Sequence, residues 1–381
     1  MIYLDNAAST PLLPEVLEFY KGAIEEDFAN PHADHALSHS CQQKLNKARV
    51  QVLKSLSAPL PETEVLWTSG GTEANNTALL CSALKAGDEV ISSTFEHPSM
   101  INPLKVLEGR GVKVHLLPID EEGQIRLDQL ESLMNEKTRM VALTALQNEL
   151  GSITDIKFVS KLIKDKYPKV LLHVDNVQGF GKLTLNWKRL QISSMSLAGH
   201  KFHGPNSCGA LVYRKGFKFE ALLVGGGQQG ALRSGTVDAA AVSAFGLAAE
   251  LNAERKKSEA KKIEALNELC REGLVKLLNK DGSAIDCQFF SMKQNSPYIL
   301  MFALKGYEGS VLMRFLSTAG VYIGVGSACS AEVKEPNRTL LAMGADRQTA
   351  FAALRVSFAW QNTAEDVKAF LAELQKVLSN Y

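Results

Sequence analysis

Short apolar segments alternate with helical patterns from about residue 70 to 250, and this alternation limits the possible folds more than any other feature. The segments are rich in Val, Ile, Leu and Thr, and each stops at turn or polar residues. They read EVLWTS, DEVISSTF, VKVHLLPI, TRMVALTAL, KVLLHVD and SSMSLAG. One intervening stretch, DIKFVSKLIKDKY, has helical spacing. Buried strands alternating with helices predict an α/β fold with a mostly parallel sheet covered on both faces.

The C-terminal third has a different pattern. Residues 237–279 contain no Pro and few Gly, which predicts one long helix or two joined helices. Its polar middle, ERKKSEAKKIE, is typical of a helix that bridges two domains through solvent. A strand in SPYILMFAL and a final amphipathic helix in TAEDVKAFLAELQKVLSN then predict a smaller α+β domain.

Composition and charge exclude several classes of protein. The 381 residues are 45% hydrophobic and 22% charged, which is ordinary for a globular chain with enough length for two domains. Lys and Arg number 42 against 41 Asp and Glu, and no basic stripe or polybasic cluster suggests direct binding of nucleic acid or a membrane surface. The N-terminus does not resemble a secretory signal, and no apolar run could span a bilayer. We therefore expect a cytoplasmic protein.

Polar residues follow the predicted strands, where parallel sheets bind ligands. Gly71 and Thr72 open a helix after VLWTS, His97 follows VISSTF, Asp175 ends KVLLHVD, and Lys201 follows SSMSLAG. Each has an ordinary structural explanation, such as a capped turn, a structural histidine or a loop lysine. Together they form the set that pyridoxal phosphate requires: a lysine for the aldehyde, a carboxylate for the ring nitrogen, a histidine against the ring and a phosphate-binding helix N-terminus.

One of the six cysteines has unusual surroundings. The chain has no CxxC pair, so local cysteine spacing predicts neither a zinc nor an iron–sulfur site, and no metal is expected. Cys329 lies in GVGSACSAEVKEPN, a small, glycine-rich and polar stretch that favours an exposed loop and a reactive thiol. Cys208, in SCGALVY, instead has the apolar context of a structural cysteine.

Arg355 is the only charged residue in AALRVSF. A strand arginine in this context is either a structural ion pair or a bidentate clamp for a carboxylate, and we favour the clamp.

Ten motifs in order across nearly the whole chain resemble the cysteine desulfurases, in the group with a long catalytic-cysteine loop, among pyridoxal phosphate enzymes of fold type I. The motifs are YLDNAAST (3–10), NP (30–31), TSGGTEANN (68–76), EHPS (96–99), NELG (148–151), HVDNVQ (173–178), GHKFHGP (199–205), LRSGT (232–236), GSACS (326–330) and LRVSF (354–358). The resemblance implies a large cofactor-binding domain over residues 14–252 and a small domain made of residues 1–13 and 253–381.

The resemblance also implies roles for individual residues. It implies that Lys201 binds the cofactor covalently, that Asp175 pairs with the pyridine nitrogen, and that His97 stacks on the ring. The remaining implied roles are a ring-hydroxyl contact for Gln178, phosphate binding for Thr72 and His200, phosphate binding in the partner subunit of a homodimer for Thr236, substrate-carboxylate binding for Asn148 and Arg355, and the sulfur-accepting nucleophile for Cys329.

The implied reaction converts L-cysteine to L-alanine and leaves a persulfide on Cys329, with Lys201 removing the α-proton and His97 shuttling a proton at the substrate thiol. The sulfur then passes to an acceptor protein for iron–sulfur cluster assembly or tRNA thiolation. A selenocysteine lyase, another pyridoxal phosphate lyase or a catalytically weak assembly partner are the alternatives. Three departures from the family pattern, Ala198, Tyr298 and Ala359, leave cofactor affinity and pocket shape open.

Overall fold

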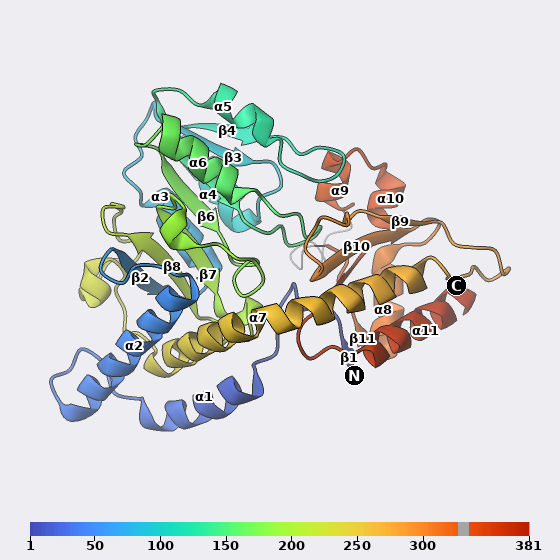
Figure 1. The fold of residues 1–381 in the computed structure, drawn as a ribbon, viewed down its shortest axis with the longest axis horizontal. Helices are drawn as coiled ribbons and strands as arrows, with labels where there is room; N and C mark the ends of the chain where they lie inside the picture. Colours follow the sequence, from blue (N-terminus) through green and yellow to red (C-terminus); the bar gives the residue numbers. More distant parts are fainter. Residues whose placement is uncertain (327–334, 381) are drawn as a thin grey trace.

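A seven-stranded sheet forms the larger part of the molecule in a computed structural model that describes residues 1–326 and 335–380 (Figure 1). The strand order is β2-β8-β7-β6-β5-β3-β4. The strands are β2 (Thr63–Thr68), β3 (Glu89–Ser93), β4 (Lys113–Leu117), β5 (Thr138–Thr144), β6 (Leu171–Asp175), β7 (Ser194–Ala198) and β8 (Gly209–Arg214). Strands β4, β3, β5, β6 and β7 are mutually parallel, as the sequence predicts.

Strand β8 was not expected from the sequence. It is antiparallel to both of its neighbours, β7 and β2, so one side of the sheet is not parallel. No α-helix lies between β7 and β8, whose sequence is GALVYR. The short turn-rich segment GHKFHGPNSC joins the two strands instead. A connection this short permits only an antiparallel neighbour.

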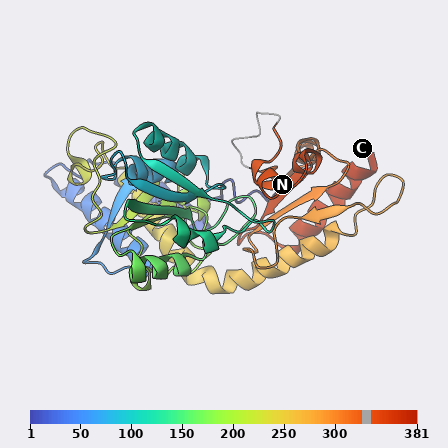
Figure 2. The same ribbon diagram turned by 90° about the horizontal axis from the view of Figure 1, so that it is seen from above.

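Helices cover both faces of this sheet (Figures 1 and 2). They are α1 (Pro14–Glu26), α2 (Ala36–Ser55), α3 (Gly71–Leu80), α4 (Pro98–Gly109), α5 (Leu130–Leu133) and α6 (Ile156–Lys166), with short 3-10 turns at η1 (Leu127–Gln129), η2 (Trp187–Arg189), η3 (Gly199–Lys201) and η4 (Gln228–Ala231). Helix α6 shows why these segments are helical. The Asp155 side chain caps its first turn, and its apolar residues fall on one buried face.

The long helix α7 (Ala239–Leu274) links the two parts of the molecule, and it is one continuous helix as the sequence allows (Figure 1). Near its start, Phe245 packs in the core beneath the large sheet. Toward its end, Ile263 and Leu266 belong to a second core. Residues 253–262, between the two cores, are all exposed or partly exposed, as expected for a bridging helix.

The second core lies beneath a three-stranded antiparallel sheet of order β12-β10-β9. The elements here are β9 (Cys287–Phe289), β10 (Ile299–Leu304), β12 (Ala353–Ser357), α8 (Gly309–Thr318), α9 (Arg338–Ala342), α10 (Arg347–Phe351) and α11 (Ala364–Asn380). The N-terminus joins this part, because β1 (Ile2–Tyr3) pairs with β11 (Val321–Tyr322) and Asp5 forms a bridge to Ser357. Within the two described ranges, no helix is long and apolar enough to cross a membrane.

Candidate active site

The carboxyl ends of β3, β6 and β7 carry the predicted polar residues at one edge of the large sheet. Asp175 is the last residue of β6, and Lys201 ends the 3-10 turn that directly follows β7. His97 follows β3 and caps helix α4, its Nδ1 accepting from the backbone N–H of Ser99 at 3.1 Å. The expectation that these residues gather at one edge follows from the parallel register of the strands.

The N-terminal segment lies across this edge and contacts the lysine. Lys201 Nζ donates to the backbone oxygens of Ala7 at 2.7 Å and Ala8 at 2.9 Å. Gln178 Nε2 donates to the same Ala7 oxygen at 2.6 Å. The motif YLDNAAST, nearly 200 residues away in sequence, therefore holds the lysine and the glutamine side by side.

The donor set around Asp175 fits pyridoxal phosphate. The Asp175 side chain is buried, and among the described residues it accepts hydrogen bonds from Asn75 Nδ2 at 2.8 Å and Val177 N at 3.0 Å. Oxygens held in place by such donors are positioned to accept from a protonated ring nitrogen. Gln178 Oε1 is buried without a hydrogen-bond partner among the described residues, which leaves an acceptor for a ligand hydroxyl.

Helix α3 begins beside this carboxylate. A Cβ at Gly71 would lie 2.6 Å from Val177 Cγ2, so only glycine allows the helix to approach this closely. Thr72, the next residue, is exposed in the first turn, where backbone N–H groups suit a phosphate. Ala198, one of the three departures from the family pattern, lies near the same helix start and supplies no hydroxyl.

Among the described residues, no hydrogen bond joins Thr236 to the other predicted phosphate ligands, Thr72 and His200. It is exposed, and its neighbour Arg233 instead pairs with Glu73 of α3 at 2.9 Å. Its expected contact with a partner subunit stays a prediction.

Arg355 is almost completely buried, and both expectations for it have support. Its Nη2 pairs with Asp5 Oδ1 at 2.6 Å, and its Nη1 donates to the backbone oxygen of Asn148 at 3.0 Å. Its Nε has no hydrogen-bond partner among the described residues. The guanidinium is thus fixed by an ion pair while keeping one buried donor for a ligand.

Burial disfavours the charged forms of the basic groups around Lys201. Burial, together with the charges of Lys201 and Lys182, lowers the pKa of His200 to about 4. It lowers the pKa of Lys182 to about 7, again with Lys201 contributing. The pKa of His97 is also lowered, by burial and by Lys201, against the opposing effect of Asp175. The site is therefore rich in neutral bases near pH 7.

His173, beneath the site, gives a testable pH dependence. Burial lowers its pKa to about 3, whereas an unfolded histidine titrates near 6.5. Below pH 6.5 the unfolded chain takes up a proton that folded His173 does not, so stability present above pH 6.5 is lost as the pH falls. His173→Gln should reduce the slope of unfolding free energy by about 1.4 kcal/mol per pH unit between pH 6 and 4. Urea unfolding of the protein without cofactor measures this slope, with exposed His39→Gln as the control; equal slopes for both variants would contradict it.

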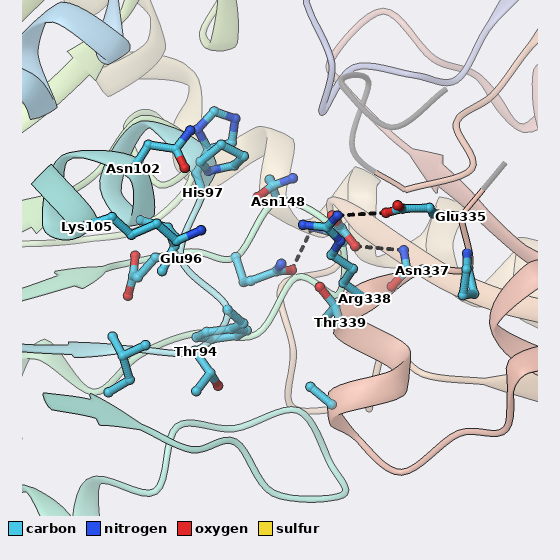
Figure 3. A pocket seen from close by; sticks show the side chains of 18 residues that line it. Thr94, Glu96, His97, Asn102, Lys105, Asn148, Glu335, Asn337, Arg338 and Thr339 are labelled. Atoms are coloured by element: carbon cyan, nitrogen blue, oxygen red, sulfur yellow. Dashed lines mark hydrogen bonds and ion pairs between the residues drawn. The ribbon is translucent and has the colours of Figure 1, made fainter. Parts of the chain in front are cut away.

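A cavity of about 540 Å³ opens beside His97 (Figure 3). Its walls include His97, Asn148 and Lys105 on one side and Asn337 and Arg338 on the other. The first wall comes from α4 and from the loop after β5, in the part of the molecule that holds the large sheet, and the second comes from the start of α9. The cavity therefore lies between the two parts of the molecule, where a small substrate can be enclosed.

Cys329 lies outside the described residues, so its predicted role is not addressed by this geometry. The other five thiols are described as free: Cys41, Cys208 and Cys270 are buried, and Cys81 and Cys287 are partly buried. Burial raises the pKa of the Cys287 thiol to about 12 and raises that of Cys208 further. These thiols have little thiolate at neutral pH.

Sequence reasoning missed three residues that the structure places at the site. Asp5, in YLDNAAST, orients Arg355, while Asn75 and Ser99, in TEANN and EHPS, bind Asp175 and His97. All three stood inside motifs that resemble the family. The available signal for Asn75 was an asparagine within a predicted helix next to the site. If such a residue is buried, its amide must find hydrogen-bond partners, because an unpaired amide is costly.

The chain matches known proteins over nearly its whole length. The profile of the aminotransferase class-V family matches residues 2–370. The NifS/IcsS protein homolog of Lactobacillus delbrueckii subsp. bulgaricus is 35% identical, covering 100% of this chain and 98% of that protein. Cysteine desulfurase IscS of Clostridium botulinum is 33% identical, covering 99% and 94%. A solved NifS-like protein superposes with a TM-score of 0.91 at 32% identity, with full coverage of both chains.

The predicted fold class and family are therefore confirmed. The sheet with its long linking helix and smaller C-terminal part has the architecture of the NifS-like structure. The aligned relatives span the N-terminal segment, the strand ends and the strand that bears Arg355. The chain belongs to the class-V aminotransferase family and, within it, to the pyridoxal-phosphate-dependent cysteine desulfurases of the NifS/IscS kind.

Proposed function

We propose that this cysteine desulfurase converts L-cysteine to L-alanine and passes the sulfur to a thiol of its own chain. One observation carries the proposal: residues 5–8 bind Arg355 through Asp5 and Lys201 through Ala7 and Ala8. A group that anchors a carboxylate and a group that moves a proton are thus held by one short segment. An α-amino acid presents a carboxylate and an α-proton on adjacent atoms, which suits this arrangement.

Several residues would hold the cofactor. Lys201 would bind its aldehyde, Asp175 its ring nitrogen and Gln178 its ring hydroxyl, while Thr72 and His200 would contact its phosphate. When bound, pyridoxal phosphate withdraws electrons from the α-carbon of the amino acid.

The side chains then divide the remaining work. Arg355 binds the substrate carboxylate through its Nε, which has no hydrogen-bond partner in the described part of the chain, and Asn148 completes that subsite. The Lys201 amine takes the α-proton, and His97 manages the proton on the substrate sulfur. The Cys329 thiolate takes that sulfur from the substrate, so that cysteine and thiol give alanine and a persulfide with no external oxidant.

The proposal is tested by incubating the purified holoenzyme with L-cysteine, L-selenocysteine and L-cystine in turn. Alanine and sulfide should form from L-cysteine in the presence of a reductant. Alanine from selenocysteine alone would indicate a selenocysteine lyase, and products from cystine alone would indicate another lyase. Lack of turnover with all three would indicate an assembly partner.

We also propose that the chain functions as a cytoplasmic homodimer and donates sulfur to an acceptor protein for iron–sulfur cluster assembly or tRNA thiolation. Support for the homodimer comes from apolar side chains left exposed on and near α1, including Ile24 and Phe28, the latter 75% exposed. Exposed Thr236 would then reach the phosphate in the partner's site. Light scattering of the purified protein measures the dimer directly.

We further propose the domain division at 13/14 and 252/253. The buried members of the largest core run from Leu13 to Ala249. The second core combines Leu4 and Ala7 with residues from Ile263 onward. Residues 4–7 therefore pack with the C-terminal part, whereas Leu13 packs in the larger core at the proposed boundary.

The Arg355 subsite gives a quantitative prediction. Arg355→Ala should lower kcat/KM for L-cysteine by roughly 2–4 kcal/mol of transition-state stabilisation, because a charge-assisted contact is lost and Asp5 is left unpaired. Cysteamine lacks the carboxylate and should be a poor substrate that loses little more in the variant. Arg338→Ala is the control, because Arg338 lines the cavity beside His97 but is 85% exposed and paired with Glu335. Equal losses for cysteine and cysteamine would make Arg355 a structural residue instead.

A further inference from the structure

A continuous chain of hydrogen-bonded side chains lies beneath the proposed cofactor site. His173 Nε2 lies 3.2 Å from Asn75 Oδ1, Asn75 Nδ2 lies 2.9 Å from Ser99 Oγ, and Ser99 Oγ lies 2.8 Å from His97 Nδ1. Asn75, Ser99 and His173 are at least nine-tenths buried. Hydrogen bonds in such surroundings are strong, and leaving any of these groups unpaired is costly.

This series of hydrogen bonds branches at Asn75, which also contacts Asp175. The same Nδ2 donates to Asp175 Oδ2 at 2.8 Å, so the two amide protons go to Ser99 and to Asp175. The opposite orientation of the amide would place an oxygen against the carboxylate, where neither atom has a proton to share. The carboxylate therefore determines which way the Asn75 amide faces.

This orientation of the amide determines where the protons lie in the other hydrogen bonds of the series. Asn75 Oδ1 must accept from His173 Nε2–H, and His173 Nδ1 accepts from the hydroxyl of Ser194 at 2.9 Å. Since Asn75 donates to Ser99 Oγ, the Ser99 hydroxyl proton is available for His97 Nδ1. The Ser99 backbone N–H also points at this nitrogen, at 3.1 Å. Nδ1 of His97 thus faces two donors and cannot carry a proton without losing them.

We propose that Asn75 is a positioning residue whose single amide orients Asp175 and, by leaving the Ser99 hydroxyl proton for His97 Nδ1, favours the neutral His97 tautomer with its proton on Nε2. In the proposed function Asp175 would bind the ring nitrogen and His97 would transfer a proton. The Asn75 side chain thereby couples these two residues. His97 then gives up a proton only at Nε2. The charged groups acting on His97 are Asp175, Lys201 and Glu149, and none of them replaces the donors at Nδ1.

The lowered pKa of His97 agrees with this arrangement, because protonation at Nδ1 would break the bond from Ser99. Asn75→Asp should reverse the direction of the hydrogen bonds from this residue to His97, while the shape of the side chain changes little. The new carboxylate only accepts, so the Ser99 hydroxyl turns toward it and its oxygen becomes an acceptor for a proton on His97 Nδ1. A second carboxylate beside Asp175 also raises the affinity of that pair for a proton.

Long-range nitrogen–proton NMR of protein labelled with ¹⁵N-histidine, without cofactor and above pH 7, reads the tautomer directly. His97→Asn assigns the signals. Wild type should show His97 with an unprotonated Nδ1. Asn75→Asp should raise the fraction of His97 with a protonated Nδ1, because it removes one of the two donors and leaves the Ser99 backbone N–H. Asn76→Asp is the matched control, since it adds the same charge one residue along, at an exposed side chain that donates to the Thr72 carbonyl. Its tautomer should match wild type.

Fluorescence titration with pyridoxal phosphate separates the two branches. Asn75→Asp should bind the cofactor about tenfold more weakly, the change expected when one hydrogen bond to a charged group is lost. Ser99→Ala cuts only the branch to His97, so affinity should stay within about twofold while the His97 signals shift. Both readouts are independent of turnover, so an inactive enzyme would not affect them. A protonated Nδ1 in wild type, or unchanged His97 signals in both variants, would overturn the proposal.

Discussion

Lys201→Ala should abolish covalent attachment of pyridoxal phosphate and lower turnover of L-cysteine by at least about 10³-fold. Proton transfer by a positioned side chain alone contributes roughly 10²–10⁴-fold, and the same amine serves both attachment and proton transfer. The substitution also removes the contacts of Lys201 Nζ with the Ala7 and Ala8 oxygens. The visible spectrum of the purified protein, before and after added L-cysteine, measures the loss.

The alternative amine is Lys182, and the experiment must distinguish the two. Lys182 is also buried, its pKa is lowered to about 7, and its Nζ donates to the backbone oxygens of Gln178 and Lys201. Borohydride reduction of the holoenzyme followed by peptide mapping should place the label on Lys201. A label on Lys182, or a visible spectrum retained in Lys201→Ala, would show that the assignment is wrong.

The sequence was sufficient for the parts of the site that depend on strand ends. Parallel strands that each end in a polar residue place those residues at one edge, so the closeness of His97, Asp175 and Lys201 required no tertiary information. The linking helix was similarly evident from a long segment without Pro. The turn-rich connection before β8 gave no signal that a further strand would pair antiparallel to β7.

The contacts made across long sequence separations could not be predicted. Asp5 and Arg355 are 350 residues apart, and neither local sequence contains a feature that identifies its partner. Asn75 similarly finds Ser99 and Asp175, 24 and 100 residues away, only once α3 packs on the sheet. Local patterns determine helices and strands, whereas these pairs depend on how the finished elements pack.

Cys329→Ser should retain bound pyridoxal phosphate and still change its spectrum when L-cysteine is added, because the chemistry at the α-carbon does not use this thiol. Release of alanine and sulfide should nevertheless fall by at least about a hundredfold, since the sulfur has no thiolate to attack it. The residue lies among residues 327–334, outside the described part of the chain. The prediction therefore rests on its sequence context and on the family.

The remaining cysteines provide the controls for this experiment. Burial raises the pKa of Cys81, Cys208, Cys270 and Cys287, and Cys41 is buried, so none offers an exposed, readily ionised thiol. Cys287→Ser, at a partly buried site, should keep normal turnover. Mass spectrometry after treatment with L-cysteine should find one added sulfur on the peptide that contains Cys329. Sulfur on another cysteine, or normal turnover in Cys329→Ser, would instead indicate a lyase that eliminates sulfur without a protein thiol.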